Sequence, residues 1–171
     1  MEKKMKKIIF AALTALFLIG CGSDATDTKN VEAKLAVGKN LAGTTLNNQN
    51  EKSVTIKPET KVVFFSFAKP TGHLCNEFLE TKPAEYLAQH NALYVADVSA
   101  APSLIKSMFI LPDLKELPFE ILLINDDTLS AEFSKGIDKE SVVVVYLDNG
   151  VITKITNAAS KEQLEKAISA K

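Results

Sequence analysis

The stretch Lys61–Cys75, KVVFFSFAKPTGHLC, joins a near-continuous apolar run to the start of an apparent helix. The run from Lys61 to Phe67 is rich in β-branched and aromatic residues, which is typical of a strand covered on both faces in a central parallel sheet. Cys75 is one of only two cysteines in the chain. The stretch therefore predicts a central strand-to-helix turn and raises the question of whether Cys75 belongs to a reactive site.

Strands alternate with helices on the C-terminal side of this turn. Apolar runs predict strands over 92–98, 119–124, 141–147 and 151–155, and Asp148-Asn149-Gly150 predicts a type I′ hairpin turn between the last two. A loop is expected between the strands at 119–124 and 141–147. This order indicates an α/β fold with a parallel-dominated sheet, completed by an antiparallel hairpin and a C-terminal helix.

Three helices are expected from spacing and capping. The first follows Cys75 and is broken or kinked at Pro83. In the second, Ser99 can cap, Pro102 suits the first turn, and one face carries Leu104, Ile105, Met108 and Phe109. The last begins with a capping box over 160–163.

Before the central strand, Leu46 and the range 54–56 suggest short strands with a turn at 47–50.

The N-terminus reads as a secretory signal. Four lysines within the first seven residues precede an apolar run from Ile8 to Ile19, which is shorter than the roughly 20 residues of a membrane-spanning helix. The run ends in Leu18-Ile19-Gly20-Cys21, which resembles a bacterial lipobox. The resemblance implies cleavage before Cys21 and its lipidation. The alternative is an uncleaved anchor in which the cysteine is incidental.

These features divide the chain into a signal peptide at 1–20, a lipidated tether at 21–34 and one domain at 35–171. Gly22 stands where an aspartate would favour inner-membrane retention, so the outer membrane is favoured. The net charge of −1 indicates no nucleic-acid partner. If Cys21 carries lipid, Cys75 is the only remaining thiol and no intramolecular disulfide can form.

Element order and several local strings resemble the thioredoxin-like superfamily, in its branch of membrane-anchored thiol–disulfide reductases and peroxiredoxin relatives. The strings are KVVFFSFA before the active-site turn, FEILLINDDTLSAEFSKGI as an inserted strand with a short helix, and VVVVYLDNGVITKI as the final hairpin. The resemblance implies an α/β thioredoxin-like fold: a central mixed sheet flanked by helices, with an N-terminal β-hairpin extension.

The active site of that family is Cys-x-x-Cys at a helix N-terminus, where the first thiol attacks a disulfide and the second resolves the mixed disulfide. Here the motif falls on Gly72-His73-Leu74-Cys75, so glycine replaces the attacking thiol. The segment 138–141, where the family commonly has a cis-proline, contains none. The implied binding groove is lined by Gly72, His73, Leu74, Cys75 and Ser141.

Several roles remain open for Cys75. It could be a buried small hydrophobe, or a shift in register could expose it at the helix start as a single catalytic thiol. The peroxiredoxins that this chain resembles carry a proline, a threonine three residues before the cysteine and a remote arginine. Thr71 is four residues before it, and the chain has no arginine.

A metal site would need three or four ligands, whereas only His73 and the distant His90 could join Cys75. No metal and no cofactor are therefore expected.

The sequence thus predicts a periplasm-facing envelope lipoprotein, held on a membrane through Cys21, that binds an unknown envelope protein or peptide without dithiol activity. The alternative is a single-cysteine thiol–disulfide oxidoreductase or redox accessory that uses Cys75.

Overall fold

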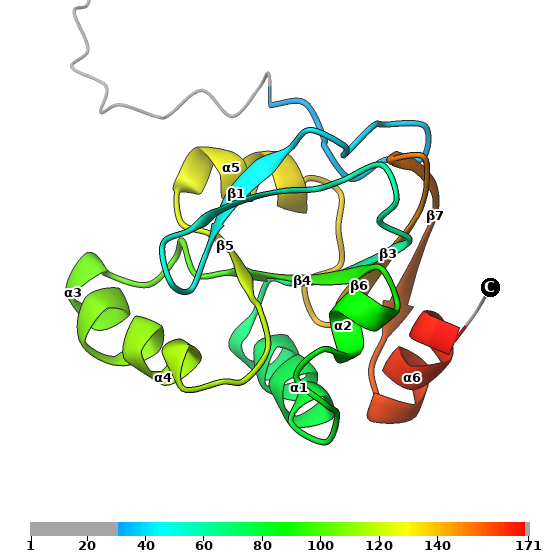
Figure 1. Cartoon of the computed structure of the whole chain (residues 1–171). Helices are drawn as coiled ribbons and strands as arrows, with labels where there is room; N and C mark the ends of the chain where they lie inside the picture. The colour runs from blue at the N-terminus through cyan, green and yellow to red at the C-terminus, as the bar shows by residue number, and fades with distance from the viewer. Residues whose placement is uncertain (1–30, 170–171) are drawn as a thin grey trace, which may run out of the picture. The chain divides into compact units, whose positions relative to one another are not determined.

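The computed structural model describes residues 31–169. The predicted signal peptide and Cys21 lie outside these residues. A seven-stranded sheet forms the centre of the described domain (Figure 1), in the order β2-β1-β5-β4-β3-β6-β7. Its strands are β1 (Thr45–Asn48), β2 (Ser53–Thr55), β3 (Val62–Ser66), β4 (Ala92–Asp97), β5 (Leu122–Ile124), β6 (Val142–Asp148) and β7 (Val151–Ala158).

The sheet is mixed, as the resemblance implied, but parallel pairing is confined to its three central strands. β3 pairs in parallel with β4, and β4 with β5, while the other four pairings are antiparallel. The expectation of a parallel-dominated sheet was wrong because the N-terminal hairpin joins β5 through β1 in antiparallel fashion. β6 also runs antiparallel to β3, with Val143 opposite Phe65.

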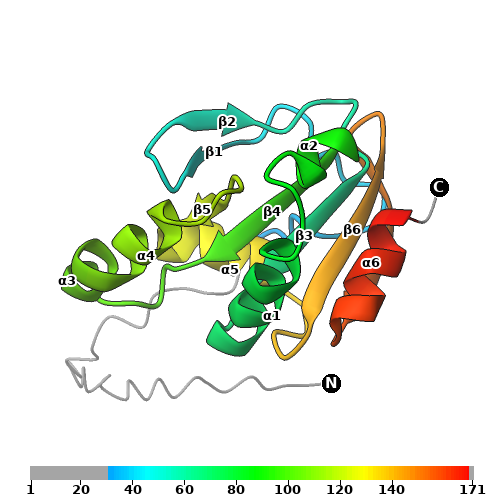
Figure 2. The same ribbon diagram turned by 60° about the horizontal axis from the view of Figure 1, so that its bottom comes forward.

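Helices cover both faces of the sheet, as Figure 2 shows. On one face lie α1 (Lys69–Leu79), α2 (Tyr86–Gln89) and α6 (Lys161–Ser169), which contribute to one apolar core. On the other face, α5 (Asp127–Ser134) and the segment 31–44 contribute to a second core. β3 is buried throughout because its side chains alternate between the two cores, with Phe64 in the first and Phe65 in the second.

Several local predictions are confirmed. Asn149 and Gly150 have φ angles of 48° and 81°, as a type I′ turn requires. The helix expected around Pro83 is interrupted there, because α1 ends at Leu79 and α2 begins at Tyr86. The side chain of Ser160 accepts a hydrogen bond from the Gln163 amide, as in the predicted cap.

Two local predictions were wrong. The loop expected before β6 contains α5, in agreement with the resemblance, and Asp126 caps α5 by accepting from the Leu129 amide at 2.9 Å. Ser99 does not cap the following helix, because α3 (Ser103–Ile105) begins only after Pro102. The backbone amide of Ser99 instead donates to Asp97 Oδ1.

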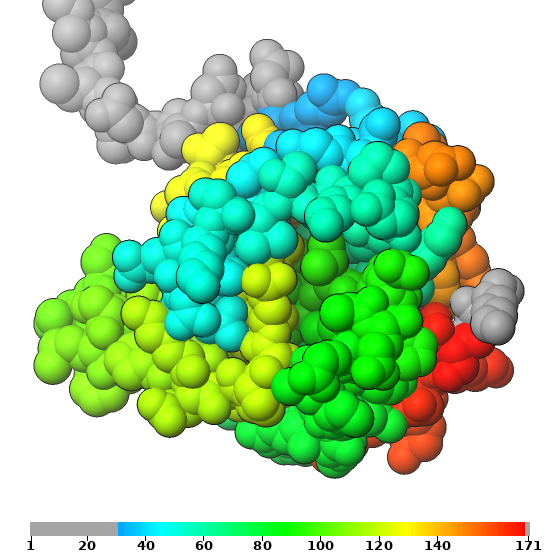
Figure 3. Space-filling model, viewed as in Figure 1, coloured from blue at the N-terminus to red at the C-terminus, as the bar shows by residue number. Residues whose placement is uncertain are grey.

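α3 continues into a π-helical turn, η2 (Lys106–Ile110), and then α4 (Leu111–Lys115). Pro112 has no amide hydrogen, which interrupts the regular α-helical ladder here. The predicted apolar face forms but does not pack into a core: Leu104, Ile105, Met108 and Phe109 are 66%, 42%, 58% and 57% exposed. Figure 3 shows this helical stretch projecting at one end of the domain. Within residues 31–169, no helix is long and apolar enough to cross a membrane.

Candidate functional site

The start of α1 forms the site that the sequence singled out. β3 leads through Phe67 to Ala68, which is extended, and α1 begins at Lys69. Thr71 Oγ1 accepts from the Ala68 amide at 3.2 Å and donates to the Ala68 carbonyl at 2.8 Å, which closes the first turn. Because Pro70 suits a first helical turn, the helix starts before the predicted motif.

The four motif positions therefore lie inside the helix rather than at its end. The Gly72 amide already donates to the Ala68 carbonyl at 3.0 Å, so it is not one of the free amides that stabilise a thiolate at a helix N-terminus. Cys75 lies one turn further on, in the middle of α1. The predicted alternative in which Cys75 stands exposed at the helix start was wrong.

Cys75 is completely buried in the core beneath α1, near Phe64, Phe78 and Tyr94. Burial raises the pKa of its thiol far above the ordinary value, and the neighbouring Tyr94 hydroxyl opposes only part of this rise. The thiol is therefore protonated at neutral pH and shielded from solvent. Both properties are opposite to those of a reactive cysteine.

Two polar side chains lie where a second thiol would point. A Cβ atom at Gly72 would lie 3.8 Å from both Ser66 Oγ and Tyr94 Oη, which is ordinary van der Waals contact. Ser66 Oγ and Tyr94 Oη are 3.0 Å apart, and Tyr94 Oη also donates to the Gly72 carbonyl at 3.5 Å. The space beside Gly72 is thus lined by a hydroxyl pair that joins the helix to the sheet.

Sequence reasoning missed Ser66 and Tyr94. The only available signal was that each places a hydroxyl in an otherwise apolar strand run, VVFFSF or ALYVADV. That signal does not say that the two hydroxyls meet, because Ser66 and Tyr94 belong to different strands. The parallel pairing of β3 with β4 brings them together.

The other predicted groove residues gather at the same edge of the sheet. His73 is exposed, while Gly72 and Leu74 are half-buried on α1. Ser141 is half-buried and immediately precedes β6. It therefore lies at the end of the sheet where β3 leads into α1. Its hydroxyl donates to Asp138 Oδ2 at 3.3 Å. Gly72, His73, Leu74 and Ser141 thus offer surface here, with Cys75 beneath it.

The described residues hold no group of three or more histidine, cysteine, aspartate or glutamate side chains that could bind a metal ion. His73 is exposed on α1, whereas the His90 ring packs 4.5 Å from that of Tyr86. Nδ1 of His90 is also 2.8 Å from the Tyr86 carbonyl oxygen. His90 therefore does not join His73 and Cys75 as a third ligand.

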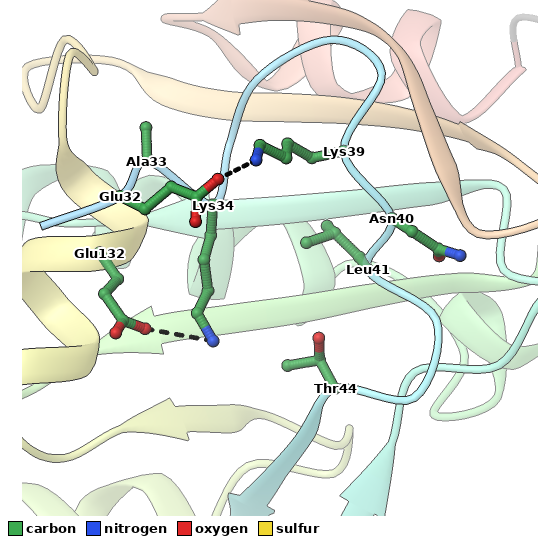
Figure 4. A pocket seen from close by; sticks show the side chains of 8 residues that line it. All are labelled: Glu32, Ala33, Lys34, Lys39, Asn40, Leu41, Thr44 and Glu132. Atoms are coloured by element: carbon green, nitrogen blue, oxygen red, sulfur yellow. Dashed lines mark hydrogen bonds and ion pairs between the residues drawn. The ribbon is translucent and has the colours of Figure 1, made fainter.

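A hollow of about 250 Å³ lies elsewhere, where the N-terminal segment passes α5 (Figure 4). Its charged side chains are already paired: Lys34 with Glu132 at 3.1 Å, and Lys39 with Glu32. This mutual neutralisation leaves no net charge to select an ionic ligand.

A second hollow, of about 420 Å³, lies between α1 and α6. Lys82 lies over the rings of Phe78 and Tyr86 and pairs with Glu165, to which the Tyr86 hydroxyl also donates. Burial, together with Glu165, raises the pKa of Tyr86 to about 12. These contacts tie α6 to α2 and to the segment between α1 and α2, and they pair Lys82 and Glu165 with each other.

Comparison with known proteins gives similarity at the level of structure. No family model and no curated protein matches the chain. Among solved structures, a putative protein disulfide isomerase from Bacteroides thetaiotaomicron is 15% identical with a TM-score of 0.50, covering 81% of this chain and 89% of its own. A putative thioredoxin from Neisseria meningitidis is 16% identical with a TM-score of 0.50, covering 77% and 91%.

A SCO1/SenC family lipoprotein from Bacillus anthracis is also similar, at 15% identity and a TM-score of 0.50, covering 80% of this chain and 97% of its own. At such identities the likeness concerns the fold alone. Together with the mixed sheet flanked by helices, it confirms the fold expected from the sequence. The chain has the thioredoxin-like fold.

Proposed function

We propose that this chain is a lipid-anchored envelope protein whose thioredoxin-like domain binds a protein or peptide partner without dithiol chemistry. One observation carries the proposal: the single thiol of the described domain, Cys75, is buried behind Gly72 and next to Tyr94. A dithiol cycle needs an exposed attacking thiolate and a resolving thiol. With glycine at position 72, the edge of the sheet offers a surface for binding and no nucleophile.

The binding surface in this proposal comprises Gly72, His73, Leu74 and Ser141, and Cys75 lies buried beneath it. A photoreactive amino acid at exposed His73 tests it, with the same substitution at exposed His90 as a matched control. We expect a crosslinked partner from position 73 and none from position 90. Leu74→Glu should weaken the crosslink, because it places a charge in the surface.

The same experiment separates binding from the single-thiol alternative. In the binding proposal, Cys75→Ala leaves the crosslink at position 73 in place, because the thiol does not touch the partner. The redox alternative requires an adduct that depends on Cys75 and is released by reductant. Rapid alkylation of Cys75 in the folded protein would favour that alternative and overturn the proposal.

Lipid anchoring is a separate part of the proposal and rests on the order of n-region, apolar run and Leu18-Ile19-Gly20-Cys21. It places the domain in the periplasm, with the outer membrane favoured over the inner. Cells labelled with palmitate should incorporate label into the wild-type chain and none into the Cys21→Ala variant. Equal labelling of the two chains would overturn this part alone.

A further inference from the structure

The exposed side chains of Leu104, Ile105, Met108 and Phe109 form one continuous surface, here called the apolar face. Each is at least 42% exposed, and all four follow the spacing of a single helical side. None of the residues in α3, η2 or α4 is buried. Apolar surface gathered in this way marks an interaction site rather than ordinary scatter.

The two polar side chains that lie between Ile105 and Met108 in the sequence have hydrogen-bond partners within the domain. Lys106 Nζ donates to the Asn125 carbonyl at 3.0 Å, which directs its charge toward the body of the domain. The Ser107 hydroxyl donates to the Leu104 carbonyl at 3.1 Å. Burying the apolar face therefore leaves neither of these two side chains without a hydrogen-bond partner.

The N-terminal chain enters the domain beside α5, and the helical stretch that carries the apolar face contacts the chain just before α5. The Lys34 amide donates to the Glu132 carbonyl on α5, at 2.9 Å. The Lys106 contact reaches Asn125, just before the other end of α5. The helix has eight residues, which corresponds to a length of about 12 Å. α5 thus has the entry point of the N-terminal chain near one end and the contact from Lys106 near the other.

We propose that the apolar face inserts into the surface of the bilayer that holds the lipid anchor. The inference rests on the proposed lipidation of Cys21. Cys21 and Val31 are ten positions apart in the sequence, so the tether spans at most about 36 Å. This short reach keeps the domain at the membrane surface, where an amphipathic helix buries its apolar side in the interfacial region.

A fluorophore at the apolar face tests this inference in the full acylated protein. The protein is reconstituted in vesicles of phosphatidylethanolamine and phosphatidylglycerol and labelled through Met108→Cys, because Cys75 is buried and Cys21 carries lipid. Ser169→Cys, exposed on α6 beside the opposite end of the sheet, is the matched control. We expect blue-shifted emission, and quenching by brominated acyl chains, at position 108 but not at 169.

A second variant removes the apolar character of the face. Leu104→Glu with Phe109→Glu should abolish quenching at position 108, while the protein still floats with the vesicles through its lipid. The unfolding midpoint should stay unchanged because both side chains are already exposed. Quenching that survives this double substitution would overturn the inference.

Three further outcomes would also overturn it. Water-like emission at position 108 on vesicle-bound protein would show that the face stays in solvent. A blue shift without quenching by brominated lipid would indicate that a second copy or another protein covers it. Failure of the protein to float would reject the lipid anchor and this inference with it, whereas the first two outcomes leave the anchor intact.

Discussion

The chemistry open to Cys75 depends on its depth in the domain. A cysteine after a central strand is a candidate nucleophile by position, but a nucleophile must ionise and meet its substrate. Cys75 is buried, and burial raises its pKa. Gly72 lies about one helical turn before Cys75. It has no side chain, and the hydrogen-bonded hydroxyl groups of Ser66 and Tyr94 line the space beside it. At this scale the site is a packed, hydrogen-bonded junction.

Cys75→Ala should make the free energy of unfolding fall less steeply as the pH rises in the alkaline range. The unfolded thiol loses its proton above its ordinary pKa of 9.0, while the folded thiol keeps it because burial raises the pKa. The unfolded state then binds fewer protons, so the free energy of unfolding falls as the pH rises above about 9. Removing the thiol should lessen this slope by up to about 1.4 kcal/mol per pH unit.

Urea unfolding of both chains, between neutral pH and about pH 10, measures this difference. Tyr94 titrates with the same sign in both chains, because burial is the largest cause of its raised pKa; Cys75 adds a smaller part of that rise, which the variant also loses. If the free energy of unfolding fell equally with pH in wild type and variant, the burial of Cys75 would be contradicted.

Among the elements, the N-terminal hairpin shows how a polar turn can be part of the core. The range 47–50 reads as a solvated turn, yet Asn48 and Gln49 are 5% and 3% exposed. Gln49 Nε2 donates to the Phe119 carbonyl at 2.7 Å, and its Oε1 accepts from the Ile121 amide at 2.9 Å. One side chain thereby extends the pairing between the hairpin and the chain entering β5.

Gln49→Ala should therefore be costly. It leaves the Phe119 carbonyl and the Ile121 amide without their side-chain partner in a buried place, which predicts a loss of about 2–4 kcal/mol in the free energy of unfolding. Asn50→Ala is the matched control, because the Asn50 side chain is exposed, and it should change stability by less than about 0.5 kcal/mol. Equal effects in chemical denaturation would show that the hairpin is not anchored this way.

In the stretch α3–η2–α4, by contrast, apolar residues with the spacing of a core helix remain exposed. Its apolar spacing is that of a helix packed on a core, and the helix forms, but the apolar face remains exposed. Periodicity specifies which residues share a side of a helix. It does not specify whether the domain has an element to place against that side.

For the molecule as a whole, the N-terminal segment is packed onto the final hairpin. Gly150 approaches it so closely that an added Cβ would lie 2.3 Å from Ala42 Cβ and 2.7 Å from Asn40 Oδ1. The Leu41 amide donates to the Gly150 carbonyl at 2.8 Å, and Leu41 is buried in the second core. The N-terminal segment thus packs directly against the turn of the final hairpin.

Gly150→Ala should destabilise the domain by about 2–5 kcal/mol, because backbone strain at a φ of 81° adds to the clash with the N-terminal segment. Gly136→Ala is the control: its φ is 74°, but nothing lies within 4 Å of the added Cβ. It should cost only the backbone strain, about 1–2 kcal/mol. Thermal unfolding that showed equal losses would contradict the close packing at Gly150.

The sequence by itself determined the α/β class, the central buried strand and the Asn149-Gly150 turn, and it shows glycine three positions before Cys75. Each depends on local residue type or spacing, which a chain carries without its tertiary contacts.

Only the tertiary structure decided that Cys75 is buried and that Ser66 and Tyr94 meet beside it. It also decided that the apolar face stays exposed. Depth, accessibility and contact between strands depend on which distant segments pack together, and no local pattern encodes that packing.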